Sequence, residues 1–119
     1  MPQLGMITTD TTDALGLSAW WADLLKGTVV EQNDGYFCVV QAPNFLVRLA
    51  FQLVEAPTAG KNRMHLDLVP TAEEGGREEV VKKFLAAGAT RVDQQIMGDF
   101  AWDVLADPQG NVFCVSDPH

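Results

Sequence analysis

The order strand, helix and three further strands occurs twice along this 119-residue sequence. The apolar helical stripe that includes Trp20 and Trp21 is repeated 60 residues later by Val80 and Val81. Near the end of each half, Phe51 and Gln52 correspond to Phe113 and Cys114, which lie 62 residues later. This repeat is longer than the units of solenoid proteins, so the sequence predicts two equivalent modules.

Hydrophobic periodicity and turn residues predict the elements of each module. The first is predicted to have strands at 4–9, 28–31, 36–41 and 45–55, and a helix at 14–26 that Gly27 closes. The second is predicted to have strands at 63–69, 90–93, 100–106 and 111–116. Thr71 and Glu74 resemble a capping box, and the glycines at 75–76 delay the second helix to about Arg77.

Composition and charge restrict the function classes. Acidic residues outnumber basic ones by 16 to 8, and the net charge of −8 disfavours a nucleic-acid or anionic-membrane partner, since either requires a positive surface. Cys38 and Cys114 lie in apolar strand segments, which favours buried thiols in a reducing cytoplasm over a disulfide framework. No apolar run has the length of a membrane span, and no signal peptide is recognised. We therefore expect one cytoplasmic domain over 1–119, with modules at about 1–57 and 61–119.

Residues 61–70 carry the most informative polar pattern. In the strand predicted there, Met64 and two leucines point to one face. Three of the four side chains on the opposite face can carry charge, namely Arg63, His65 and Asp67. A strand with such a polar face is expected to form one wall of a pocket.

The sequence resembles the vicinal oxygen chelate superfamily, which includes glyoxalase I, bleomycin-resistance proteins and extradiol dioxygenases, and in particular its small glyoxalase-like members. The resemblance covers nearly the whole chain. It rests on the helix entry at 10–21, KNRMHLDL at 61–68, LAAGA at 85–89 and WDVLADPQGNVFCV at 102–115. It implies an α+β fold of two βαβββ modules, with helices on the outer face of a mixed sheet that curves into an open cup. It also implies a homodimer, with which exposed sheet edges are consistent.

The resemblance further implies four positions for a divalent metal ion in the cup. They fall at or beside Met6 and on Gln52, His65 and Cys114. Only His65 is a routine ligand of a catalytic divalent ion, and Cys114 stands where metal-binding members usually carry Glu. A hard ion requires carboxylates, so we expect no metal cofactor, with a soft site at His65 and Cys114 as the alternative.

The candidate polar residues each have a functional and a structural interpretation. His65 is a candidate catalytic acid or base, metal ligand or hydrogen-bond donor to a ligand, and its alternative is a packed histidine between strands. Asp67 lies on the same face and shares its polar pocket, or instead pairs with Arg63 or another basic side chain. Arg48, on one face with Gln52, binds a carboxylate or phosphate, or instead lies at a rim in a surface pair.

Two further side chains complete the predicted ligand site. Trp102 is the aromatic residue expected to stack on a flat ligand, and its alternative is core packing. Cys114 is interpreted as an inert buried thiol rather than a nucleophile, because no basic residue adjoins it in sequence. The predicted ligand contacts are therefore Arg48, Gln52, His65, Asp67, Trp102 and Cys114.

Three functions are compatible with these residues. The first is sequestration of a small apolar or aromatic molecule without turnover, as in bleomycin-resistance proteins. The second is a glyoxalase-like lyase or isomerase that uses His65 as acid, base or metal ligand. The third is a structural or regulatory subunit with a vestigial cup. The absence of carboxylates at the four implied metal positions favours the first, or a metal-free form of the second.

Overall fold

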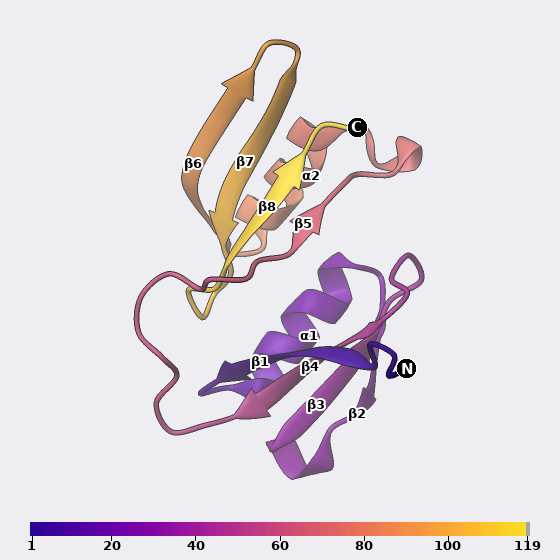
Figure 1. The fold of residues 1–119 in the computed structure, drawn as a ribbon, viewed down its shortest axis with the longest axis vertical. Coiled ribbons are helices and arrows are strands. Elements are labelled where there is room, and N and C mark those ends of the chain that lie inside the picture. The colour runs from indigo at the N-terminus through magenta and orange to yellow at the C-terminus, as the bar shows by residue number, and fades with distance from the viewer. Residues whose placement is uncertain (119) are drawn as a thin grey trace. The chain divides into compact units, whose positions relative to one another are not determined.

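The duplicated order of elements is present in the structure, a computed structural model that describes residues 1–118. The chain divides into two compact units, the first spanning Met1–Ala59 and the second beginning at Gly60. Each unit has a four-stranded mixed sheet and one α-helix (Figure 1). The predicted α+β fold of two βαβββ modules is confirmed.

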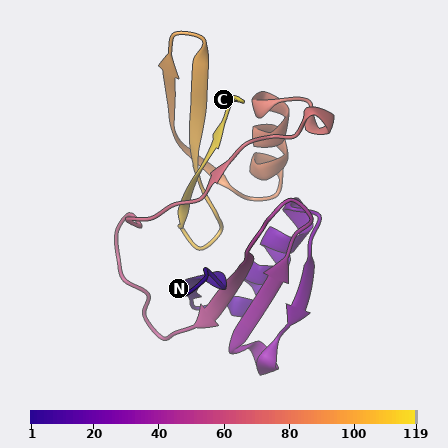
Figure 2. The same ribbon diagram turned by 45° about the vertical axis from the view of Figure 1, so that its right-hand side comes forward.

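The first unit contains β1 (Met6–Thr11), α1 (Ala14–Leu24), β2 (Thr28–Glu31), β3 (Phe37–Gln41) and β4 (Arg48–Leu53), with a short 3-10 helix, η1 (Asn33–Gly35), between β2 and β3. The sheet order is β1-β4-β3-β2, in which β1 is parallel to β4 and the other pairs are antiparallel. Helix α1 covers one face of this sheet (Figure 2). The core between them includes Leu17, Trp21, Cys38, Leu49 and Phe51.

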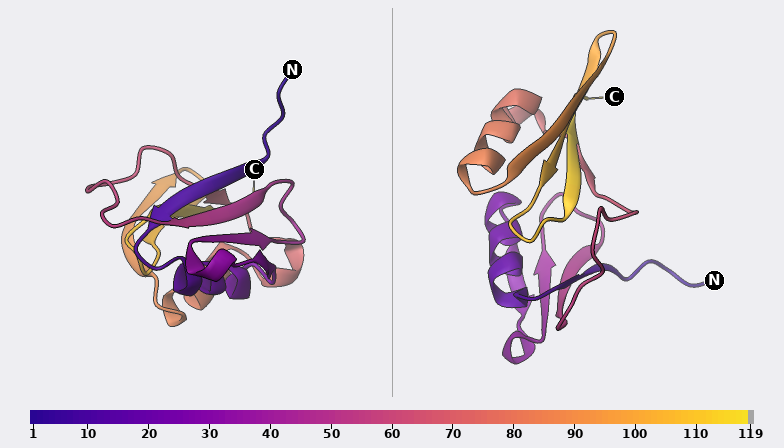
Figure 3. Two further views of the ribbon diagram at one scale, coloured as in Figure 1. Left: turned by 90° about the horizontal axis from the view of Figure 1, so that it is seen from below. Right: turned by 90° about the vertical axis from the view of Figure 1, so that its left-hand side faces the viewer.

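The second unit repeats this plan. It contains β5 (Asp67–Leu68), η2 (Ala72–Glu74), α2 (Arg77–Ala86), β6 (Thr90–Met97), β7 (Phe100–Ala106) and β8 (Val112–Ser116). The sheet order is β5-β8-β7-β6, with β5 parallel to β8. Helix α2 lies against one face of the sheet (Figure 3). The rings of Phe84 and Phe113 meet there with centroids 5.0 Å apart.

Local sequence signals place both helices. Asp13 caps α1 by accepting a hydrogen bond from the Gly16 backbone N–H at 2.9 Å. The expected capping box is present, since Glu74 accepts hydrogen bonds from the backbone N–H and the hydroxyl of Thr71. It belongs to η2, and α2 starts at Arg77 as predicted.

Several predicted boundaries are wrong. The strand expected at 63–69 is reduced to Asp67–Leu68, and Met64 is 86% exposed instead of facing the core. The residue with a left-handed backbone conformation after helix α1 is Lys26, whose φ is 54°, and not Gly27 as expected. Gly27 instead allows a close approach of two backbone segments, because a Cβ there would lie 2.6 Å from the Gln41 carbonyl oxygen. In addition, β4 is shorter than the expected 45–55, and β6 extends to Met97.

Both cysteines are free and buried, as expected. Among the residues that the structure describes, no helix has the length and apolar character needed to cross a membrane.

Candidate functional site

A histidine, an aspartate and a cysteine meet on one face of the second sheet. The Nδ1 atom of His65 lies 2.7 Å from Oδ1 of Asp67 and 3.9 Å from Sγ of Cys114. One ligand atom from each of the three residues lies within 4.8 Å of the other two. His65 and Asp67, which were predicted to lie on one polar face, are therefore in direct contact, and the ligand pocket predicted there stays a prediction. We call these residues the HDC cluster.

The parallel pairing of β5 with β8 brings the cluster together. Asp67 is the Cα partner of Cys114, and the Cys114 backbone N–H donates to the Leu66 carbonyl at 2.8 Å. Side chains of directly opposite strand residues point to the same face. His65 precedes Asp67 by two residues and reaches the same side, although it lies just outside the strand.

Next to the HDC cluster, the side chain of Asn62 makes hydrogen bonds that the backbone of a strand residue would otherwise make. Its Oδ1 accepts a hydrogen bond from the Val112 N–H at 2.7 Å, and its Nδ2 donates to the Val112 carbonyl at 2.9 Å and to the Met64 carbonyl at 2.7 Å. The side chain thereby continues the β5–β8 ladder where the backbone of residues 63–66 leaves it. Sequence reasoning missed Asn62, because Val112 lies 50 positions away and no local motif connects them.

The electrostatics of the HDC cluster disfavour a nucleophilic thiol. Burial raises the pKa of Cys114, and the negative charge and hydrogen bond of Asp67 raise it further. A carboxylate only accepts hydrogen bonds, so His65 donates through Nδ1 to Asp67. The Nδ1 atom that lies near the Cys114 sulfur is therefore engaged with Asp67 and is not free to take the thiol proton, whereas an activated cysteine has an imidazole as its base. The interpretation of Cys114 as an inert buried thiol agrees with this arrangement.

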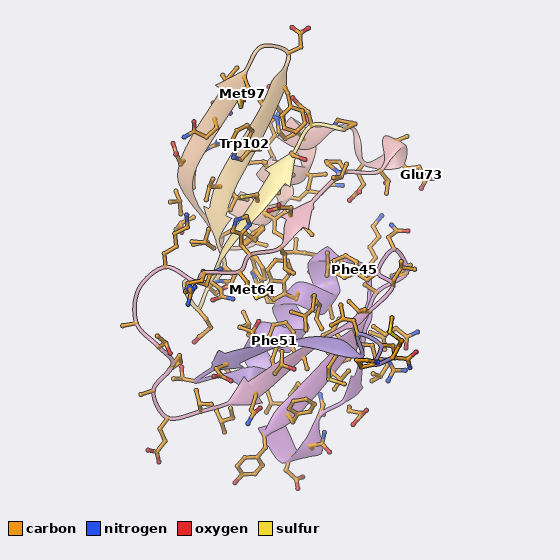
Figure 4. The ribbon with its side chains drawn as sticks, in the orientation of Figure 1. Phe45, Phe51, Met64, Glu73, Met97 and Trp102 are labelled. Carbon is orange, nitrogen blue, oxygen red and sulfur yellow. The ribbon has the colours of Figure 1, made fainter. Side chains whose placement is uncertain are left out.

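Trp102 lies on the same face of the sheet as the HDC cluster. Val104 is the Cα partner of Cys114, and Trp102 is two residues from Val104 along β7, opposite Ser116. The indole is half-buried, and its ring centroid is 5.9 Å from that of Phe100. Figure 4 labels Trp102 on β7. An aromatic surface is therefore available on the side from which His65 projects.

The other predicted site residues lie in the first unit. Arg48 is exposed at the start of β4 and donates from Nη2 to Oε1 of Gln41 at 3.0 Å, which matches the surface-pair interpretation. Gln52 is exposed near the end of β4, opposite Asp10 of β1 and Phe37 of β3. The binding functions assigned to Arg48 and Gln52 stay predictions.

The strand register changes one equivalence between the modules. Gln52 is the counterpart of Cys114, and its β1 partner is Asp10, just as the β5 partner of Cys114 is Asp67. Thr8, two residues before Asp10, therefore corresponds to His65. The position was predicted at or beside Met6, which lies two residues before Thr8 and pairs with Arg48 at the far end of β4.

A second polar cluster lies on the opposite, helix-facing side of the second sheet. Asp103 is 1% exposed and accepts hydrogen bonds from Arg77, Arg91 and Gln94. Arg77, the first residue of α2, also donates from Nε to Oδ1 of Asp117 at 2.9 Å. This cluster attaches the start of α2 to the sheet. Sequence reasoning missed it, since the residues lie on two strands, on a helix and just after the last strand.

Charge and hydrogen bonding favour the ionised forms of Arg77 and Asp117. Burial acts to lower the pKa of Arg77, but hydrogen bonds to Asp103 and Asp117 and their charges outweigh it and raise the pKa. The pKa of Asp117 is lowered by the hydrogen bond from the Ala101 backbone N–H, at 2.8 Å, and then by Arg77. The cluster is closed by mutual partners, so we assign it to stability.

The HDC cluster does not fit a hard divalent ion. It offers one carboxylate, one imidazole and one thiol, whereas Mg²⁺ and Mn²⁺ prefer sets dominated by oxygen. The residues of the first unit at the equivalent strand positions are Gln52, Thr8 and Asp10. Nitrogen and sulfur donors suit zinc-like ions better.

Comparison with known proteins gives a consistent result. Residues 6–116 match the model of the glyoxalase-like domain family. A comparison with curated proteins finds no match.

Solved structures with the same fold cover almost the whole chain. A glyoxalase/bleomycin resistance protein/dioxygenase family enzyme from Burkholderia phytofirmans PsJN is 20% identical with a TM-score of 0.80, covering 97% of this chain and 98% of that one. Lactoylglutathione lyase from Agrobacterium tumefaciens is 13% identical with a TM-score of 0.71, covering 96% and 92%. A mutant of the fosfomycin resistance protein FosX from Listeria monocytogenes, complexed with Mn(II) and 1S,2S-dihydroxypropylphosphonic acid, is 12% identical with a TM-score of 0.76, covering 97% and 89%. At these identities the likeness shows the fold alone.

Proposed function

The chain belongs to the glyoxalase-like domain family, and from this premise we propose that it binds a small apolar or aromatic molecule beside the HDC cluster without a hard divalent metal ion. The observation that carries the proposal is the 2.7 Å contact between His65 Nδ1 and Asp67 Oδ1 on the sheet face that also holds Trp102. This contact engages the Nδ1 atom of the imidazole, so Nε2 is the ring nitrogen through which we propose that His65 meets a ligand.

The chemistry of the face defines the ligand class. A neutral imidazole that donates through Nδ1 accepts a hydrogen bond at Nε2. The half-buried Trp102 offers a ring on which a planar ligand can stack. We therefore propose a flat, largely apolar molecule with a hydroxyl group that donates to His65.

Binding is tested by thermal shift with a panel of probes such as catechol and 1-naphthol. A probe at 100 times its Kd stabilises the folded chain by about 2.7 kcal/mol, which raises Tm measurably. His65→Ala removes one hydrogen bond and is expected to weaken binding about tenfold. Lys82→Ala, at an exposed residue of helix α2, is the control and should leave Kd unchanged. A panel without any shift, or equal Kd values for both variants, would contradict the proposal.

The same contact favours a second candidate, a lyase or isomerase that moves a proton through His65. Asp67 holds the imidazole in one tautomer and orientation, as the partner of a general base does. If a substrate is turned over, His65→Ala is expected to lower kcat by about 10²- to 10⁴-fold. If His65→Ala binds the probe more weakly and the wild-type chain turns nothing over, the protein binds its ligand without catalysis.

Metal content is predicted from the donor set. We expect no stoichiometric Ni, Zn, Fe or Mn in the purified chain. A single carboxylate does not suit Mn or Fe, and the nitrogen and sulfur donors that a zinc-like ion would need are engaged in mutual hydrogen bonds. Elemental analysis checks this directly. One such ion per chain that is lost in His65→Ala would contradict the metal-free proposal.

We also propose that the chain works in the reducing cytoplasm. The support is that Cys38 and Cys114 are both free and buried, as is usual where thiols stay reduced.

A further inference from the structure

Two basic side chains directly precede the HDC cluster in the second unit. Lys61 and Arg63 are two of only eight basic residues in a chain whose net charge is −8. No acidic residue lies between Glu55 and Asp67. With a neutral imidazole, the segment at 61–67 therefore carries two positive charges and one negative charge, which leaves a local excess of one positive charge in an acidic chain.

Asn62 places Lys61 next to the start of β8. The Asn62 side chain is hydrogen-bonded to both the N–H and the carbonyl of Val112, which lies two residues before Cys114. Met64, whose carbonyl accepts a third hydrogen bond from Asn62, is labelled in this segment in Figure 4. The residue before Asn62 is thereby held near the strand that carries the thiol.

The charge of Lys61 reaches the HDC cluster. Burial and Asp67 raise the pKa of the Cys114 thiol, and the positive charge of Lys61 acts in the opposite direction. Salt screens the charges of exposed groups over about 8 to 10 Å, so the ammonium group lies within that range of the sulfur. Lys61 thus belongs to the electrostatic surroundings of the cluster.

No carboxylate of the described residues neutralises these two side chains. Among residues 1–118, neither Lys61 nor Arg63 forms an ion pair, and both are exposed. The carboxylate of the cluster, Asp67, is engaged by Nδ1 of His65. An ammonium group is a compact point charge on a flexible stem, so Lys61 can follow an anionic substituent of a molecule bound beside it.

We propose that the ligand of the HDC cluster is an aromatic hydroxy acid whose carboxylate pairs with Lys61. This inference rests on the binding function proposed above and adds a charge to the ligand. The hydroxyl donates to His65, the ring stacks on Trp102, and the carboxylate meets the ammonium group. A single negative charge matches the local excess of one positive charge, whereas a phosphate dianion would be repelled more strongly by Asp67.

Pairs of ligands that differ only in charge test the proposal. Calorimetry at neutral pH and low ionic strength measures Kd for 3-hydroxybenzoate and 6-hydroxy-2-naphthoate, each beside its uncharged methyl ester. The two acids differ in the spacing between hydroxyl and carboxylate. An exposed ion pair changes affinity by up to about fivefold, so we expect at least one acid to bind about fivefold more tightly than its ester. This preference should shrink at high ionic strength.

Variants locate the charge that recognises the acid. Lys61→Gln is expected to remove the preference for the acid and to leave the Kd of the ester unchanged, whereas Lys61→Arg should keep the preference. Lys83→Gln, at an exposed residue of α2, changes the net charge of the chain by the same amount and is the matched control. It should bind both compounds as the wild-type chain does.

The outcomes separate this inference from the function on which it rests. Equal binding of acid and ester by the wild-type chain, with binding of the ester weakened in His65→Ala, would overturn the anion subsite alone. A preference for the acid that persists in Lys61→Gln, or that is lost equally in Lys83→Gln, would also overturn it. No binding of any of these compounds would overturn both proposals.

Discussion

An aspartate lies at the centre of each polar cluster in the second unit. Asp67 joins the imidazole to the thiol, and Asp103 joins two guanidinium groups and an amide. The two carboxylates lie on opposite faces of one sheet and have different surroundings. Asp67 is 61% exposed at its side chain and can meet a ligand, whereas Asp103 is enclosed by its partners.

The buried carboxylate of Asp103 predicts a large effect on stability. Asp103→Ala leaves Arg77 without its most buried partner, and breaking such a pair typically costs about 3–5 kcal/mol. We expect the free energy of unfolding in urea to fall by this amount. Asp99→Ala, in the exposed turn that joins β6 to β7, is the control and should change it by less than about 1 kcal/mol. Equal effects at the two positions would contradict the assignment of this cluster to stability.

Asp117 predicts a dependence of stability on pH. Its pKa in the folded chain is lowered, so the ionised carboxylate is favoured by folding. This contribution is present above the unfolded pKa of about 3.9 and is lost as pH falls through the folded pKa. The stability difference between wild type and Asp117→Asn should therefore be full at neutral pH and shrink in acid. Urea unfolding across this range measures it, and a difference that grows as pH falls would contradict the prediction.

At the scale of elements, β5 shows why part of the site could be predicted. Alternation along residues 63–69 identified the side on which His65 and Asp67 lie, because that pattern is local. It overestimated the length of the strand, because hydrogen bonds expected from the backbone are made by the Asn62 side chain. The repeated order of elements predicted the fold for a related reason, since periodicity extends over the whole chain. The contacts of Asn62 and Asp103 are long-range and leave no local pattern.

A substitution at Asn62 tests whether its side chain holds the segment before β5 against β8. Asn62→Ala removes three hydrogen bonds and leaves the Val112 N–H without its acceptor, so we expect a loss of about 1–3 kcal/mol in unfolding free energy. The Cys114 amide, bonded to Leu66, should exchange faster with solvent. Asn44→Ala, in an exposed loop of the first unit, serves as the comparison and should change neither quantity. Unchanged exchange at Cys114 in Asn62→Ala would show that the side chain does not hold this segment.

At the scale of the whole molecule, the chain is two separately cored units joined by an exposed segment. Residues 54–66 contain no helix or strand, and the unit boundary falls between Ala59 and Gly60. Each unit has its own sheet, helix and buried residues.

This organisation predicts the site of first proteolysis. Exposed segments without regular structure are cleaved before helices and strands. Trypsin should therefore cut first after Lys61 or Arg63 and release two fragments of similar size, which mass spectrometry identifies. Initial cleavage within α2, at Lys82 or Lys83, would contradict this order.

The register that aligns Thr8 with His65 has an evolutionary consequence. A fold that is present in duplicate can keep its chemistry in one copy while the other diverges, and here the imidazole belongs to the second copy only. Asp10 still stands where Asp67 stands in its twin. Thr8→His would place an imidazole two residues before Asp10, as His65 stands two residues before Asp67, with Gln52 in place of the thiol.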